Sequence, residues 1–378
     1  MRDSILPQEK KTKFFHAHFS LLKDPRRTAK GNFYYPFDEV LFLVISAVLS
    51  SAEGWVPISL FGRTKLEWLR QYFPYENGTP SHDVLGKLFA LIDPVRFNEC
   101  FMNWVNSISA IAQGEVIAID GKSLCGSANK AEGRSPFHLV SAYAAKNRLC
   151  LGQHCVSEKS NEITAIPALL DMLAIQDCVV TIDAMGCQRD IAQKILDRGA
   201  DYILMVKDNQ KDLKEQVEKV FSIQAPSPSH RQLDLGHGRI EKRDCEVIDR
   251  LGFLDGREKW PQLNSIVRIR SERQNKQNGQ TSEETRYYIS SLKENAEQFN
   301  SKVRQHWAIE NNLHWALDVI FKEDGSLMKK GNSAINFSIV SKMALAMLER
   351  EKSTKMSKPS KRLKAALDDE YRSLILKT

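Results

Sequence analysis

Two aspartates stand at the ends of short apolar segments, where their carboxylates could do chemistry. Asp120 ends the β-rich run at 115–120 (EVIAID), and Asp183 ends a second such run at 178–183 (CVVTID). If the two runs are neighbouring strands, both carboxylates converge at one edge of a sheet, where their repulsion makes them share a proton or hold a hard cation. Mg²⁺ is the natural occupant, with Mn²⁺ as a substitute, because it prefers oxygen ligands and uses few carboxylates together with substrate phosphates. The competing interpretation is that each aspartate only starts a turn or caps a helix.

A third acid, Glu310, is singled out by its position on a predicted helix. At about 100° per residue, one core-facing stripe is formed by Ile309, Leu313, Ala316, Leu317 and Ile320. Glu310 lies at the edge of this stripe and can reach the edge of a sheet on which the helix packs, whereas Asp318 points away from the core. Glu310 is therefore expected to join the two aspartates.

Two histidines flank this acid, His306 four residues before it and His314 four residues after it. A zinc site is disfavoured because the HExxH arrangement is absent. We interpret the histidines as polar partners of Glu310 or as contacts to DNA phosphate. Trp307 and Trp315 are interpreted as packing residues, with base stacking as the alternative.

The elements that must position these residues follow an α/β layout. Residues 1–112 are predicted to be helical and compact. The pattern then changes to a strand ending at Asp120, a hairpin at 137–156, and strands at 178–183 and 201–206 that alternate with helices. A β-rich insertion at 222–292 interrupts this layout, with strands predicted at 239–248, 265–272 and 285–292. Helical periodicity returns at 296–321, and the expected fold class is α/β with a mixed sheet.

Charge is concentrated at the two ends of the chain. The net charge of the 378 residues is +7, with +5 in residues 1–30 and +4 in residues 351–378. Basic ends suit a polyanion such as DNA, although solvated surface lysines explain the charge equally well. The last 25 or so residues are expected to be basic and partly mobile.

Other features of the sequence exclude several classes of protein. The longest apolar run, at 40–49, is half as long as a membrane-spanning helix needs to be. No secretory signal is recognised at the N-terminus. The seven cysteines include no CxxC pair and no zinc-like spacing, so free thiols in a reducing cytoplasm are expected.

Longer motifs carry a resemblance to a known family. The segments VIAIDGKSL (116–124), VVTIDAMGCQ (179–188) and RQHWAIENNLHWALDVIFKED (304–324) closely resemble the H-repeat-associated proteins, which are insertion-sequence transposases of the DDE type. The resemblance extends to PSHDVLGKLFALID (80–93) and YILMVKDNQ (202–210), and so spans nearly the whole chain.

The resemblance implies an RNase H-like catalytic core in which Asp120, Asp183 and Glu310 bind the metal and catalyse the reaction. It also implies a β-rich insertion between the second aspartate and the glutamate. The expected organisation is a DNA-binding helical domain at 1–112, a catalytic domain at 113–350 and a basic tail at 351–378. One departure matters: the Tyr, Arg and Lys that some related transposases place around the glutamate are here Val303, His306 and Leu317. Their phosphate contacts therefore cannot be transferred to this chain.

The function expected from these features is metal-dependent cleavage and strand transfer on double-stranded DNA, at the ends of a mobile element and into its target. A homodimer is expected in action, because an element has two ends. Two alternatives stay open, a DNA-binding remnant that has lost catalysis and an RNase H-like nuclease without strand transfer. The candidate DNA contacts are Lys122, Lys207, Arg304, His306, His314, Arg26 and Arg27.

Overall fold

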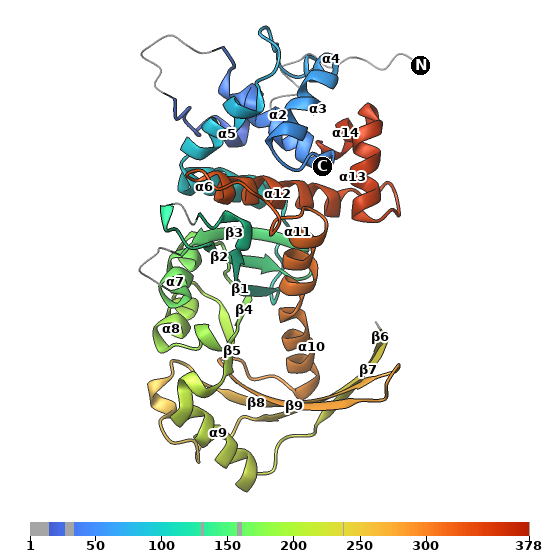
Figure 1. Cartoon of the computed structure of the whole chain (residues 1–378). Helices are drawn as coiled ribbons and strands as arrows, with labels where there is room; N and C mark the ends of the chain where they lie inside the picture. Colours follow the sequence, from blue (N-terminus) through green and yellow to red (C-terminus); the bar gives the residue numbers. More distant parts are fainter. Residues whose placement is uncertain (1–14, 27–33, 130–131, 157–160, 237, 378) are drawn as a thin grey trace.

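A single mixed sheet of nine strands forms the centre of the molecule (Figure 1). The computed structural model describes residues 15–26, 34–129, 132–156, 161–236 and 238–377. The spatial order of the strands is β3-β2-β1-β4-β5-β9-β8-β7-β6. Their bounds are β1 Val116–Leu124, β2 Phe137–Ala144, β3 Leu149–Cys155, β4 Val179–Ile182, β5 Asp201–Val206, β6 His230–Gly236, β7 Arg239–Ile248, β8 Ser265–Asn275 and β9 Thr281–Ser290.

The strand directions divide the sheet into two parts. Strands β1, β4 and β5 are parallel to one another, and the β2–β3 hairpin is antiparallel to β1. The other part, β6 to β9, is antiparallel throughout and joins the first through the antiparallel pair β5–β9. The prediction of β structure within 222–292 is confirmed, and the insertion continues the central sheet.

The apolar residues of β4 and β5 alternate between the two faces of the sheet, as strands buried on both faces require. Val180, Ile182, Tyr202 and Leu204 belong to the larger apolar core, into which helices α7 (Glu162–Met172), α8 (Arg189–Asp197) and α9 (Lys211–Ile223) also pack. On the other face, Val179, Ile203 and Met205 share a second core with helix α10 (Ala296–His306). Helix α10 therefore covers the face of the sheet that carries Val179, Ile203 and Met205.

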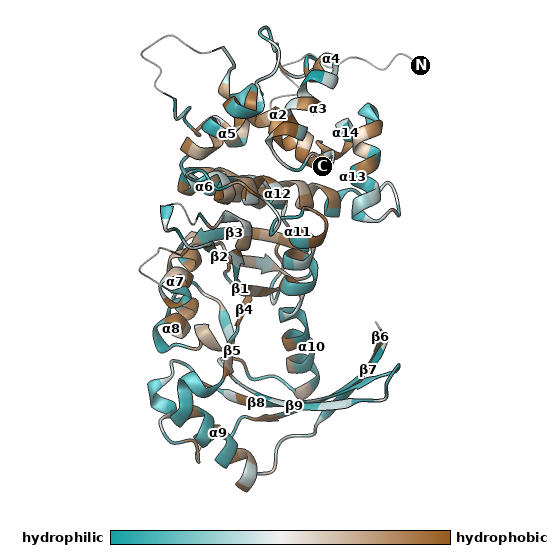
Figure 2. Cartoon of the chain, viewed as in Figure 1, coloured by the Kyte–Doolittle hydropathy of each residue, from teal (hydrophilic) through white to brown (hydrophobic). Residues whose placement is uncertain are grey.

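The helices near the two ends of the chain pack on the β3 side of the sheet (Figure 1). They are α2 (Phe37–Leu49), α3 (Trp55–Thr64), α4 (Leu66–Leu69), α5 (His82–Leu91), α6 (Pro94–Ile108) and α12 (Ser333–Arg350). Residues 333–348 of α12 are all buried, and Figure 2 shows this helix largely in the hydrophobic colour. Its Asn336 donates hydrogen bonds to the carbonyls of Phe89 and Ile92. Because one core cluster contains residues of these helices and of the sheet, the domain boundaries at 112 and 350 stay a prediction.

The C-terminal segment differs from the partly mobile tail expected from the sequence. Residues Lys358–Leu367 form helix α13 and Asp369–Ile375 form helix α14. Arg362 and Arg372 are buried, and the Arg372 guanidinium lies 3.9 Å from the ring centroid of Trp68. Lys65 and Asp369 form an ion pair at 2.8 Å between the N-terminal helices and α14. The expectation of a mobile tail is therefore wrong for these residues. Two of the basic side chains, Arg362 and Arg372, are buried in the packed interior.

Two adjacent residues of α14 provide a test of this packing. Ile375 is fully buried whereas Leu374 is 42% exposed. Ile375→Ala should lower the free energy of unfolding by about 2–4 kcal/mol because it leaves a cavity. Leu374→Ala should cost less than about 1 kcal/mol. Denaturant titration of both variants measures the difference, and equal small effects would mean that α14 is not part of the cooperative fold.

Candidate active site

The register of the parallel pair β1–β4 places the two aspartates side by side. Ile119 is the partner of Ile182, and each strand continues with an aspartate, Asp120 in β1 and Asp183 after β4. Neighbouring strands lie about 4.8 Å apart, and residues at matched positions point to the same face. The face is that of Thr181, which contacts helix α10. The structure thus brings together the two acids that end the predicted strands.

Asp183 also caps a helical turn, which is the competing interpretation of an aspartate at the end of a strand. Its Oδ1 accepts a hydrogen bond from the backbone N–H of Met185 at 3.1 Å and so caps the short 3₁₀ turn Ala184–Gly186. The cap fixes the carboxylate at the end of the strand. Capping therefore accompanies the pairing of the acids.

The pKa of Asp120 is raised by burial and by neighbouring carboxylates. Burial, and next to it the carboxylate of Asp183, raise the pKa of Asp120 to about 7, and Glu310 and Glu162 add smaller contributions in the same direction. The backbone N–H of Gly121 opposes these effects. Since a group with this pKa ionises only at a cost near neutrality, a cation placed among the carboxylates would relieve their repulsion.

The predicted helix that carries Glu310 is interrupted by a wider turn. Helix α10 is followed by a π-helical segment, Ile309–His314, and then by α11 (Trp315–Val319). The predicted core stripe is confirmed, since all five of its residues are buried. Glu310 itself is exposed and lines a cavity together with residues of α10 and of the insertion. Segments with π geometry occur often at functional sites because they redirect side chains without ending the helix.

His314 contacts the first aspartate. Its Nδ1 lies 3.4 Å from Oδ2 of Asp120. Burial, with smaller effects of Lys342 and Lys122, lowers the pKa of His314 to about 3. The ring is therefore neutral at physiological pH, and its position favours the interpretation as a polar partner of the acids, here of Asp120.

His306 is placed differently from the prediction. It is buried, its Nδ1 lies 3.0 Å from Oγ1 of Thr181, and burial lowers its pKa to about 4. A buried neutral imidazole in the α10–β4 interface is poorly placed to contact a phosphate, and its partner is Thr181. The structure thus argues against both roles considered for His306.

Lys122 is paired with carboxylates of the protein itself. Its ammonium group forms ion pairs with Asp318 at 2.7 Å, Glu323 at 3.1 Å and Asp324 at 3.0 Å, and its side chain is 11% exposed. Burial alone would lower the pKa of Lys122, but these carboxylates, Glu323 first, raise it above the usual value. The charge is compensated within the protein, which argues against a phosphate contact. The 2.7 Å ion pair also turns Asp318 toward β1 and leaves it half-buried, so the prediction that Asp318 points away from the core is wrong.

The other candidate cations lie in three different places. Lys207 is exposed directly after β5, in a loop that Asn209 ties to the carbonyl of Ala184 at 2.6 Å. Arg304 is 44% exposed on α10, with Asp234 and Glu241 only at 3.8 and 4.0 Å. Arg26 pairs with Asp24 near the N-terminus, and Arg27 lies outside the described residues. A DNA contact by any of these cations stays a prediction.

Sequence reasoning missed a polar chain on the opposite face of β1. Oγ of Ser123 lies 2.9 Å from Nδ1 of His138, whose Nε2 lies 2.6 Å from Oε1 of Glu162. A Cβ at Gly121 would lie 2.2 Å from that carboxylate oxygen, so glycine is needed beside Asp120. The signal that could have revealed Glu162 is the glycine directly after a candidate catalytic acid, since it indicates the close approach of another group.

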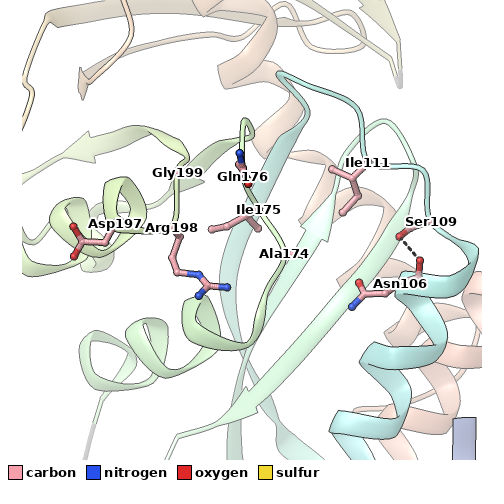
Figure 3. A pocket seen from close by; sticks show the side chains of 9 residues that line it. All are labelled: Asn106, Ser109, Ile111, Ala174, Ile175, Gln176, Asp197, Arg198 and Gly199. Atoms are coloured by element: carbon pink, nitrogen blue, oxygen red, sulfur yellow. Dashed lines mark hydrogen bonds between the residues drawn. The ribbon is translucent and has the colours of Figure 1, made fainter.

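A more voluminous cavity lies elsewhere in the described part of the chain. It has a volume of about 830 Å³ and is lined by residues that precede the parallel strands, among them Ile111, Gln176 and Gly199 (Figure 3). The acids follow the same strands, so the cavity and the acids are at opposite ends of the sheet. This cavity is not the site of the acids.

The donor set around Asp120 fits a hard cation, although no cage is preformed. Within residues 15–26, 34–129, 132–156, 161–236 and 238–377, no three His, Cys, Asp or Glu side chains are grouped as a ready metal site. The β1–β4 register nonetheless sets the carboxylates of Asp120 and Asp183 next to each other. Mg²⁺ retains several waters and needs only one or two carboxylates, so an open arrangement of oxygen donors is compatible with it.

The pKa of Asp120 predicts a stability change with pH. In the unfolded chain this carboxyl ionises near its usual value of 3.8, but in the folded protein near 7. The folded state therefore binds more protons in between, and the free energy of unfolding falls as pH rises from about 4 to about 7. Asp120→Asn should remove this loss and stabilise the protein in excess EDTA at about pH 8, by at most about 4 kcal/mol.

Thermal unfolding as a function of pH measures the effect. The advantage of Asp120→Asn should shrink as the pH is lowered toward 4, and Asp190→Asn, an exposed carboxylate in α8, should show no such trend. A variant that is no more stable than the wild type at about pH 8 would contradict the crowding of charge at Asp120.

Comparisons with known proteins cover most of the chain. The family model described as "Transposase DDE domain" matches residues 111–347, and the model "DDE_Tnp_1-associated" matches residues 16–105. The H repeat-associated protein YhhI of Escherichia coli K12, which carries a transposase name, is 40% identical over 371 residues, or 95% of this chain and 96% of YhhI. YbfL of the same strain has the same identity and coverage.

A shorter relative has a different name. The protein named inactive transposase YbfQ, also of E. coli K12, is 41% identical over 71 residues, or 19% of this chain and 82% of YbfQ. The two longer relatives and the domain match carry the assignment. On that basis the chain belongs to the DDE transposase family and is similar to its H repeat-associated members.

Proposed function

We propose that this protein is an active transposase that cleaves double-stranded DNA at the ends of its element and joins them to a target, with Mg²⁺ as cofactor. The observation that carries the proposal is the alignment of Asp120 and Asp183 at the ends of neighbouring parallel strands, with the Glu310 helix crossing the same face. The order β3-β2-β1-β4-β5, with three parallel strands and an antiparallel hairpin, supports an RNase H-like core.

Asp120, Asp183 and Glu310 would hold the metal. When bound, Mg²⁺ lowers the pKa of the attacking water or 3′-hydroxyl and stabilises the charge on the leaving oxygen. The protein's own contribution is positional: the β1–β4 register sets the two aspartates, the cap on Met185 fixes Asp183, and the neutral ring of His314 lies beside Asp120 without adding positive charge. No residue of the chain is needed as a nucleophile.

The proposal extends to partners. Residues 1–112 would recognise the element's ends, with the basic surplus of both chain ends adding unspecific affinity. Two copies would act together on the two ends of one element, in the cytoplasm where the DNA lies. No described helix is both long and apolar enough to cross a membrane.

Two other functions remain as competing proposals. The protein could be a DNA-binding remnant without catalysis, an alternative favoured by the existence of a relative named inactive. It could also be an RNase H-like nuclease that cuts without joining. Purified protein incubated with the DNA that flanks its own locus and Mg²⁺ separates the three, since only a transposase gives both cleavage at the locus boundaries and strand-joined products.

The three acids should be needed together for cleavage. Asp120→Asn, Asp183→Asn and Glu310→Gln each remove a charge with little change in volume, so each should abolish cleavage while DNA binding persists. The losses should be non-additive because the acids act as one unit. Glu297→Gln, an exposed acid on the same helical segment, is the matched control and should cleave normally. If Asp318→Asn abolishes cleavage and Glu310→Gln does not, the third acid is wrongly assigned.

The choice of metal gives an independent prediction. Mg²⁺ and Mn²⁺ should support cleavage, whereas Ca²⁺ should permit DNA binding with little turnover, because its flexible coordination misplaces the reacting oxygens. A chelator should stop cleavage without lowering the melting temperature, since the core depends on no structural metal. Cleavage assays and melting curves in each metal measure both effects. Full activity in excess chelator would contradict a metal mechanism.

A further inference from the structure

One face of the insertion strands carries a set of arginines that the acids do not explain. Residues of β7, β8 and β9 alternate between two faces, and on one face their inner positions pack against α10, as Cys245, Ile269 and Tyr288 do. Farther along the same face the apolar residues give way to Arg239 and Arg243 of β7, Arg273 of β8 and Arg286 of β9. Figure 2 shows the outer part of β7 in the hydrophilic colour.

These arginines line a cavity that reaches the candidate active site. The cavity has a volume of about 200 Å³, and its helical wall is formed by Arg304, Trp307, Glu310 and Asn311. The Arg286 guanidinium lies 4.6 Å from the ring centroid of Trp307. Glu310 belongs both to this wall and to the carboxylates that raise the pKa of Asp120. A group bound in the cavity would therefore be a neighbour of the reacting centre.

The cavity has more positive charge than its surroundings compensate. Five arginines line it, and the carboxylates that pair with them are Asp234, Glu241 and Glu284. Arg239 has no ion-pair partner among the described residues, and the two pairs of Arg304 measure 3.8 and 4.0 Å. Five arginines and three carboxylates leave two positive charges uncompensated, if Glu310 is counted as a metal ligand and not as a partner of the arginines.

The most buried of these groups is also incompletely bonded. Arg243 is 5% exposed and pairs with Asp234 at 2.7 Å, yet its Nε has no hydrogen-bond partner among the described residues. The buried Nε of Arg273 lies 3.4 Å from Oε1 of Glu241, without a hydrogen bond. Burial, and next to it the charge of Arg304, lower the pKa of Arg243 below its usual range. Buried guanidinium groups that repel each other are stabilised by an anion, and their planar N–H donors match the oxygens of a phosphate.

We propose that this cavity binds a backbone phosphate of the DNA strand whose neighbouring phosphodiester is presented to Asp120, Asp183 and Glu310. The proposal rests on the proposed function, because it assumes that DNA is the substrate of the acids. It also accounts for a property of the Glu310 helix. Val303 and Leu317 are buried and apolar and His306 is buried and neutral, so phosphate-binding charge beside Glu310 comes mainly from the insertion strands.

The test compares two double variants that remove equal charge from opposite faces of the same strands. Arg239→Ala/Arg273→Ala removes two arginines of the cavity. Lys242→Ala/Arg270→Ala is the matched control, since both residues lie on the other face of β7 and β8 and pair with carboxylates there. Binding of a fluorescently labelled duplex of generic sequence is measured by anisotropy in excess EDTA over a series of salt concentrations.

The cavity variant should bind DNA about tenfold more weakly or worse, and its log–log salt dependence should be flatter by about 1, because one lost phosphate contact contributes about 0.9. The control variant should retain most of the affinity and the wild-type slope. Arg239→Lys/Arg273→Lys should restore the slope, since lysine also binds phosphate as a point charge. Melting curves identify loss of fold, and Arg304→Ala, at an exposed position, repeats the test outside the strands.

Two results would overturn the inference: unchanged binding and slope in the cavity variants, or equal losses in the cavity and control variants. Because binding is measured without metal, it is independent of catalysis. Failure of the wild type to cleave any DNA in Mg²⁺ or Mn²⁺ would contradict the proposed function and leave the binding result standing. Arg304→Ala and the cavity double variant could instead bind DNA with the wild-type affinity and salt dependence while cleavage is normal. That result would contradict only the phosphate site.

Discussion

The parallel pairing of β1 with β4 is the constraint on which the site depends. It places Ile119 opposite Ile182 and so sets Asp120 and Asp183 next to each other on the face that α10 covers. Because the side-chain period of a strand is two, a slip of one residue in either strand would send one of the aspartates to the opposite face, toward α7 and α8. The buried, alternating apolar residues of both strands prevent such a slip. The position of the acids is therefore a consequence of core packing on both sides of the sheet.

The sequence predicted the elements with strong periodicity and missed those without it. The strands at 239–248 and 265–272, and the helix that carries Glu310, were found because their apolar residues recur at the expected spacing. Strand β6 was missed because HRQLDLG is mostly polar and lies at the edge of the sheet, where only one neighbour is paired. The C-terminal helices were missed because their lysines and arginines indicate solvent, whereas Arg362 and Arg372 stack on aromatic rings in the interior.

The acids were predictable for a physical reason that does not extend to the basic residues. A carboxylate at the end of an apolar strand has few possible positions, so Asp120 and Asp183 could be placed from the strand alone. A long cationic side chain can pair with any carboxylate within its reach, and its partners come from distant segments. Lys122 is compensated by residues about 200 positions later in the chain, and nothing local to Lys122 indicates this. For the same reason, the arginines of β7, β8 and β9 gather only once the sheet is formed.

The pairing of β5 with β9 joins these two kinds of site. Since β9 is hydrogen-bonded to the strand next to β4, the arginine-bearing face continues the sheet surface on which the aspartates lie. Helix α10 spans both parts: Phe299 and Val303 pack on the insertion and β5, and Glu310 follows at the end nearer to β1. A sheet continued through hydrogen bonds holds its parts at a fixed spacing, which a domain tethered by flexible linkers would not. If the insertion binds a phosphate as proposed, it would position a strand of DNA relative to the acids without any movement of its own, and pre-organisation of this kind lowers the entropic cost of orienting a reacting phosphodiester.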